Sequence, residues 1–168
     1  MLLTDFDRLP ADDAATVVRV WADVPWWIDR IVSERPFASA AALEARAAEL
    51  TADWTQDDLD AALAQHPRIG ERASGAGSDA AHSRREQSAM TEADASTAAR
   101  IAAGNAEYER RFGRVFLIRA AGRSPEEMLA ALQRRLGNDP EAEWREAAGQ
   151  LAEIAVLRLR STVTEEEA

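Results

Sequence analysis

The chain has 168 residues, of which 46% are apolar and 30% are charged, a size and composition that suit one domain with its own core. It contains no cysteine, which excludes disulfides, thiolate metal sites and a cysteine nucleophile. The formal net charge of −10 argues against a nucleic-acid partner and against an acidic membrane surface, because both attract basic proteins.

The composition also favours helices. Alanine supplies 37 residues and all 20 basic residues are arginine, so Schiff-base chemistry on a lysine is excluded. Both are strong helix formers, and only 8 glycines and 6 prolines interrupt them, which predicts an all-α fold. No apolar run approaches the roughly 18 to 20 residues that span a bilayer, and acidic residues stand early in the chain where a signal peptide is basic. We therefore expect a cytoplasmic protein, and the arginine-only composition suggests a bacterial one.

Helix signals recur along the first half of the chain. The predicted helices there are 11–21, 26–33, 40–53 and 56–64. Pro25 is expected to separate the first two of them. Ser39 is an N-cap candidate for the third, and Thr55 with Asp58 resembles a capping box for the fourth.

The second half of the chain continues in the same way. Helices are predicted over 92–111, over 125–135 and from 140 toward the C-terminus. Ser124, Pro125 and Glu127 form a sharp start signal, and Asp139 before Pro140 repeats it. The β-like stretch 115–118 is too short and too isolated for a sheet, so it is interpreted as a buried extended connector.

These elements predict a compact, single-domain helical bundle of about seven to nine helices over residues 1–168. The acidic tail 164–168 is expected to fray. Trp26, Trp27, Trp54 and Trp144 are expected to anchor the core.

The least helical stretch, 66–83, has a histidine near each end. His66 precedes Pro67, which disfavours helical backbone and displays the imidazole where a helix stops. A site residue is one interpretation. The other is a structural histidine that is stabilised by the helix dipole.

Ser83, Glu86 and Gln87 form a second candidate cluster. They are either a capping box at a helix start or a hydroxyl, an acid and an amide that converge on one ligand. His82 and Glu86 are four residues apart, but two ligands do not make a metal site, so no metal is expected.

Arg158 and Arg160 lie in the last predicted helix. Because they point about 200° apart, one of the two is expected to approach the core. There it would bind a carboxylate or a planar ligand, or pack its stem along the surface with its head in water.

Taken in order, several motifs resemble those of the OHCU decarboxylases, enzymes of urate breakdown. The motifs are R-P-F at 35–37, H-P-R-I-G at 66–70, S-x-x-E-Q at 83–87, N-x-x-Y-x-x-R-F-G at 105–113, F-L-I at 116–118 and E-I-A-x-L-R-L at 153–159. The resemblance runs over nearly the whole chain. It implies an all-α lyase without metal or organic cofactor that converts 2-oxo-4-hydroxy-4-carboxy-5-ureidoimidazoline to (S)-allantoin.

The resemblance also implies roles for individual residues. His66 corresponds to the proton donor and Glu86 to the acid that works with it. Pro67, Ser83 and Gln87 correspond to substrate contacts.

Three further residues take their expected roles from the same resemblance. The connector, represented by Phe116 and Ile118, would line the substrate ring, and Arg158 would bind a carboxylate or carbonyl. Family members are often homodimers, so a homodimer is an expectation too. The alternative function is a non-catalytic interaction module with the same fold, although such a module has no need for the candidate catalytic residues.

Overall fold

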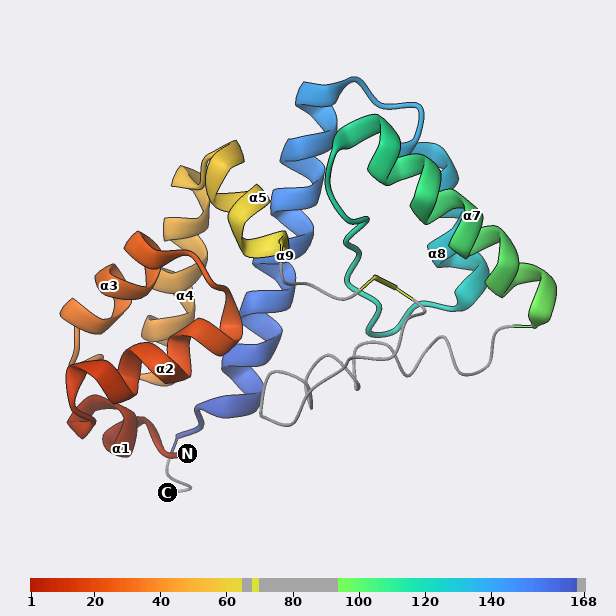
Figure 1. Cartoon of the computed structure of the whole chain (residues 1–168). Coiled ribbons are helices and arrows are strands. Elements are labelled where there is room, and N and C mark those ends of the chain that lie inside the picture. Colours follow the sequence, from red (N-terminus) through yellow and green to blue (C-terminus); the bar gives the residue numbers. More distant parts are fainter. Residues whose placement is uncertain (65–67, 70–93, 166–168) are drawn as a thin grey trace. The chain divides into compact units, whose positions relative to one another are not determined.

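The computed structural model describes residues 1–64, 68–69 and 94–165. In these residues every regular element longer than a single bridge is a helix (Figure 1). The all-α prediction is therefore confirmed, with eight α-helices in the described part of the chain. The described helices include none that is both long and apolar enough to cross a bilayer. The chain divides into two compact units, Met1–Ala62 with Ala152–Ala168, and Leu63–Leu151. The prediction of a single domain over 1–168 stays a prediction.

The first unit contains five helices and a short 3₁₀ turn from the N-terminal part of the chain. They are α1 (Leu3–Arg8), α2 (Ala11–Trp21), α3 (Pro25–Ser33), α4 (Ala40–Leu50), the 3₁₀ turn Thr51–Asp53 and α5 (Gln56–Leu63). Pro25 does not separate two helices as expected but is the first residue of α3, where its missing N–H would have no helical partner.

The predicted caps of the first unit are present. The Ser39 hydroxyl accepts a hydrogen bond from the N–H of Ala42. Thr55 and Asp58 exchange hydrogen bonds between side chain and backbone in both directions, so an aspartate here completes a capping box. Each cap satisfies backbone N–H groups that the helix itself leaves unpaired.

Aromatic residues fill the core of the first unit. Trp27 and Trp54 are buried, as predicted, and meet edge to face with ring centroids 5.7 Å apart. Trp27 donates its indole N–H to the carbonyl of Ala47. Trp26 is only half-buried, and its indole N–H bonds the carboxylate of Asp58 at the start of α5. Trp144, which lies in the second unit, is also half-buried, so two of the four tryptophans are less buried than predicted.

Arg35, in the R-P-F motif, has a structural role in the first unit. The peptide bond between Arg35 and Pro36 is cis. The Arg35 Nη1 donates to the carbonyls of Phe6 and Leu9 at 2.7 and 3.0 Å, and its guanidinium lies over the Phe6 ring. The arginine therefore ties the end of α3 to α1.

Replacing Arg35 with alanine is expected to lower the free energy of unfolding by about 2 kcal/mol, because charge-assisted hydrogen bonds to two carbonyls are lost. Urea denaturation followed by circular dichroism measures the change. Arg30→Ala is the matched control, since Arg30 is largely exposed and pairs with Glu34 at the surface, where such a pair contributes at most about 1 kcal/mol. Equal effects of the two substitutions would contradict the structural role of Arg35.

The second unit contains α7 (Ala95–Phe112), α8 (Pro125–Arg135) and the first half of α9 (Pro140–Thr162), whose second half belongs to the first unit. The predicted helix 92–111 starts later than expected, because the Asp94 carboxylate accepts the N–H of Thr97 and makes Asp94 the N-cap. It ends at Gly113, which takes the left-handed conformation with φ 72°. The predicted capping box of Ser124 and Glu127 is present at α8.

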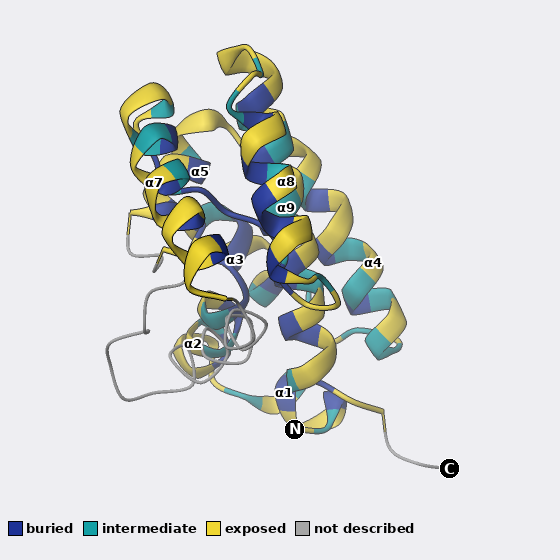
Figure 2. Ribbon diagram, turned by 90° about the vertical axis from the view of Figure 1, so that its right-hand side faces the viewer, coloured by how far each residue is buried: buried dark blue, intermediate teal, exposed yellow. Residues whose placement is uncertain are grey.

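The stretch between α7 and α8 is the buried connector that the sequence predicts (Figure 2). Its residues 115–120 form neither helix nor strand. It contributes to a hydrophobic cluster with both helices, whose buried members are Ile69, Ile101, Tyr108, Phe116, Ile118, Ala120, Met128, Leu129 and Leu132. Gly104 lets α7 approach α8, since a Cβ there would lie 2.6 Å from Cδ2 of Leu132.

The end of the chain is described as far as Glu165. Thr164 pairs with the N-terminal segment, with its carbonyl accepting the N–H of Leu3 at 2.9 Å. The Glu165 carboxylate accepts the N–H of Ala40. Two residues of the tail expected to fray, Thr164 and Glu165, thus form hydrogen bonds with Leu3 and Ala40 of the same unit, and residues 166–168 lie outside the described part of the chain.

Candidate active site

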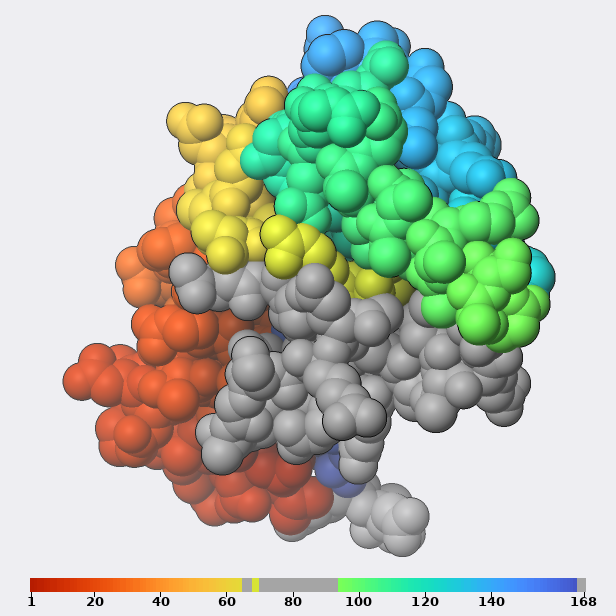
Figure 3. Space-filling view, turned by 45° about the vertical axis from the view of Figure 1, so that its right-hand side comes forward, coloured from red at the N-terminus to blue at the C-terminus, as the bar shows by residue number. Residues whose placement is uncertain are grey.

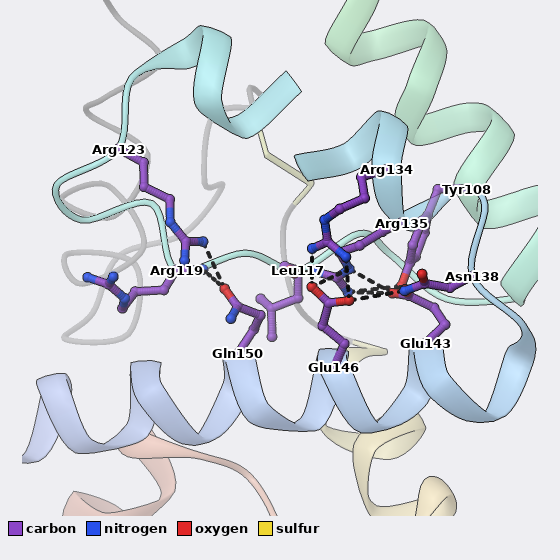
Figure 4. Close-up of polar contacts among 10 residues, drawn as sticks. All are labelled: Tyr108, Leu117, Arg119, Arg123, Arg134, Arg135, Asn138, Glu143, Glu146 and Gln150. Carbon is purple, nitrogen blue, oxygen red and sulfur yellow. Dashed lines mark hydrogen bonds and ion pairs between the residues drawn. The ribbon is translucent and has the colours of Figure 1, made fainter. Parts of the chain in front are cut away.

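The connector 115–120 is held by side chains from two different helices (Figure 4). From α8, the Arg135 Nη1 donates to the carbonyl of Leu117 at 2.7 Å. From α9, the Gln150 Oε1 accepts the backbone N–H of Arg119 at 2.9 Å and the Nη1–H of Arg123 at 3.0 Å. The connector has no helix or sheet hydrogen bonds, so these side chains hold its backbone and satisfy buried polar groups in it.

Arg135 is itself part of a buried ionic network. Its side chain is 1% exposed and that of its partner Glu143 is 0% exposed. The Nε of Arg135 donates to Glu143 Oε1 at 2.9 Å, and the phenol of Tyr108 donates to the same oxygen. Asn138 donates to the other carboxylate oxygen at 2.8 Å. The guanidinium also lies over the Phe116 ring, with Cζ 4.7 Å from the ring centroid. A buried charge is stable only with such partners.

The electrostatics of the network are set by this burial. Burial raises the pKa of the Tyr108 phenol well above its usual range, so the phenol remains neutral and acts as a donor to Glu143. At the outer edge, hydrogen bonds from Arg134 hold the pKa of the Glu146 carboxyl below its usual value. The network is thus a charged, fully hydrogen-bonded support beneath the connector.

The described end of the H-P-R-I-G motif is anchored in the same unit. In the space-filling view, α7 is the green part of the surface (Figure 3). Arg68 Nη2 bonds Glu109 Oε2 at 2.8 Å, and these hydrogen bonds hold the pKa of the Glu109 carboxyl below its usual value. Asn105 donates its amide N–H to the carbonyl of Ile69 at 3.0 Å. Ile69 shares the hydrophobic cluster with Phe116 and Ile118, so the motif end and the connector share one core.

Arg158 belongs to the first unit and is the arginine that turns inward. It is buried, and its Nη1 donates to the carbonyl of Val20 at 2.9 Å. Arg160 is exposed and pairs with Glu44, with Nε 2.7 Å from Oε2. The prediction that one of the two approaches the core is confirmed.

The other predicted site residues are outside the described part of the chain. These are His66, Pro67, Ser83, Glu86 and Gln87. Among the described residues, no three histidine, aspartate or glutamate side chains form a group that could hold a metal ion.

Comparison with known proteins decides the family. A family model described as OHCU decarboxylase matches residues 7–160. The chain belongs to the OHCU decarboxylase family. A 2-oxo-4-hydroxy-4-carboxy-5-ureidoimidazoline decarboxylase of Amia calva is 36% identical over 133 residues, which cover 78% of this chain and 76% of that protein. A decarboxylase of the same name from Haloferax volcanii is 28% identical over 168 residues and covers 99% and 98%.

A solved structure supports the fold of this OHCU decarboxylase family member. The crystal structure of an OHCU decarboxylase in the presence of (S)-allantoin superposes with a TM-score of 0.72 at 27% identity, over 85% of this chain and 94% of that one. The similarity in sequence and the similarity in fold therefore point to the same family.

Sequence reasoning missed the two residues that hold the connector of this OHCU decarboxylase family member, Arg135 and Gln150, and the ion-pair partner of Arg135, Glu143. Arg135, Glu143 and Gln150 carry no recognised motif. A signal was nevertheless present, because Met128, Leu132 and Arg135 follow one another at helical spacing along a single face. An arginine in register with an apolar stripe indicates a buried, partnered charge.

Proposed function

We propose that the chain decarboxylates 2-oxo-4-hydroxy-4-carboxy-5-ureidoimidazoline to (S)-allantoin, the reaction that completes urate breakdown, without a metal or an organic cofactor. The match to the family model over residues 7–160 is the observation that carries this conclusion. The shared core of Ile69 and the connector supports it, because two segments expected at the site belong to one cluster.

The reaction breaks the bond between the ring carbon and its carboxylate, and carbon dioxide leaves. The electron pair that remains on the ring carbon is delocalised into the adjacent imine or quenched by a proton. Delivery of that proton to one face gives a single enantiomer. His66 is the proposed donor, since the pKa of histidine lies near the working pH and a positioned acid or base gives about 10² to 10⁴-fold in rate.

Glu86 is proposed to work with His66, either by orienting the imidazole or by accepting the proton of the 4-hydroxyl group. Pro67, Ser83 and Gln87 are proposed substrate contacts.

The remaining proposed contacts are described residues. The backbone of the connector around Phe116 and Ile118 would line the ring with placed donors and acceptors. Arg158 would bind the anionic group, because an acidic protein needs a local cation for an anionic substrate. Homodimer formation and a bacterial cytoplasmic location belong to the same proposal, supported by family membership and by composition.

The test generates the unstable substrate in situ from urate with urate oxidase and the hydrolase that acts next, and follows the circular dichroism of the product. We expect optically active allantoin to accumulate rapidly when the protein is present, and EDTA to leave the rate unchanged. The same mixture without the protein is the control. A slow, racemic background with the protein present would contradict the proposal and would favour a non-catalytic module of this fold.

A further inference from the structure

We propose that Gln150 and Arg135 are positioning residues of the decarboxylation: they fix the connector 115–120 by one edge of its backbone so that the other edge is held ready for the substrate. The inference rests on the proposed function, since it assigns these residues to the reaction that the connector serves. We call the two side chains with their hydrogen bonds to the connector the connector clamp.

The pattern of hydrogen bonds shows which edge of the connector is held. In extended backbone, the N–H and C=O groups of residues i and i+2 point to the same edge. The clamp takes the carbonyl of Leu117 and the N–H of Arg119, which are two residues apart. We infer that the backbone groups of Ile118, which lies between them, face the opposite edge. Within the described ranges, no hydrogen bond to the N–H or C=O of Ile118 is present.

Further hydrogen bonds hold both attachment points of the clamp. Arg135 is 1% exposed, and its guanidinium donates to Glu143. The Oε1 atom of Gln150 accepts hydrogen bonds from both Arg119 and Arg123. The turn between these two residues contains a further hydrogen bond, from the N–H of Arg123 to the carbonyl of Ala120 at 3.0 Å. Figure 4 shows Gln150 extending from α9 toward both arginines.

A fixed connector matters for this chemistry because its donors and acceptors must already be in place when the ring binds. Ordering a loop at the moment of binding reduces affinity, and a small misplacement of the substrate slows the reaction. Gln150 is the better residue to test, because it is uncharged and only half-buried. Its removal leaves the buried ion pair of Arg135 and Glu143 intact.

The experiment compares Gln150→Leu, which removes the acceptor at similar size, with Gln150→Glu, which keeps a carbonyl-type oxygen for Arg119 and Arg123. We expect Gln150→Leu to raise both the KM of the reaction and the Kd for (S)-allantoin about tenfold, because the connector would then have to be ordered when the ring binds. Gln150→Glu should stay within about twofold of the wild type, since an acceptor remains. The coupled assay gives KM and kcat, and isothermal titration with (S)-allantoin gives Kd.

Gln133→Leu is the matched control, because Gln133 is exposed on α8 and the same loss of an amide there should leave KM and Kd unchanged. The clamp proposal is overturned if Gln150→Leu matches the wild type in KM and Kd, or if Gln150→Glu loses as much as Gln150→Leu. A lower melting temperature of Gln150→Leu with unchanged KM and Kd would show a purely structural role and would also overturn the clamp proposal. A wild type that produces no optically active allantoin instead overturns the proposed function, and the clamp's assignment with it.

Discussion

Replacing His66 with alanine is expected to lower kcat for the formation of optically active allantoin by about 10² to 10⁴-fold, the range that a positioned acid or base contributes. The proton that quenches the ring carbon would then come from water at either face, so the residual product should approach a racemate. The coupled assay with circular dichroism detection reports both the rate and the optical purity. The far-ultraviolet spectrum and the melting temperature of the variant should match the wild type.

The chain offers an internal control for this substitution, because it contains one other histidine. His82→Ala should retain wild-type activity, and added imidazole should restore part of the rate of His66→Ala but not change that of His82→Ala. Glu86→Ala should behave like His66→Ala. Activity that survives His66→Ala, depends on a metal ion and is lost in His82→Ala would instead indicate a metal-dependent hydrolase built on His82 and Glu86. Unfolding of His66→Ala would indicate a structural histidine.

Local signals predicted the helices well because capping is chemistry among near neighbours. The Ser124, Pro125 and Glu127 signal gave the start of α8, and Ser39 and Thr55 marked the starts of their helices as expected. One error in the predicted helices concerns proline, which can either interrupt a helix or begin one. Pro25 was predicted as a break and is instead a helix start.

The candidate site was less predictable, since its support depends on pairs that are distant in the sequence. The order of motifs identified the family, and the helical register predicted that either Arg158 or Arg160 approaches the core, which Arg158 does. Nothing local says that Arg135 bonds the carbonyl of Leu117, or that Gln150 bonds the N–H of Arg119, 31 residues away. Such pairings follow from how α8 and α9 pack in the second unit. The register of Arg135 with Met128 and Leu132 could have predicted its burial, although not its partner.

The largest expected effect on stability comes from the buried pair. Arg135→Met should lower the free energy of unfolding by about 3 to 5 kcal/mol, because the Glu143 carboxylate is left buried without its cation. For a chain of this length, that loss corresponds to a melting temperature lower by roughly 6 to 20 °C. Urea denaturation and thermal melting followed by circular dichroism measure the two quantities.

Arg134→Met is the matched control, because Arg134 precedes Arg135 in α8 but its side chain is 58% exposed and pairs with Glu146 near the surface. Its loss should cost at most about 1 kcal/mol. The second comparison adds Glu143→Gln to Arg135→Met. Glutamine keeps an acceptor for the Tyr108 phenol and removes the unpaired charge, so the double variant should recover about 1 to 2 kcal/mol relative to Arg135→Met. If Arg135→Met cost no more than Arg134→Met, or if Glu143→Gln gave no recovery, the cost would lie in lost packing of the long side chain against Tyr108 and Phe116 and not in the buried charge.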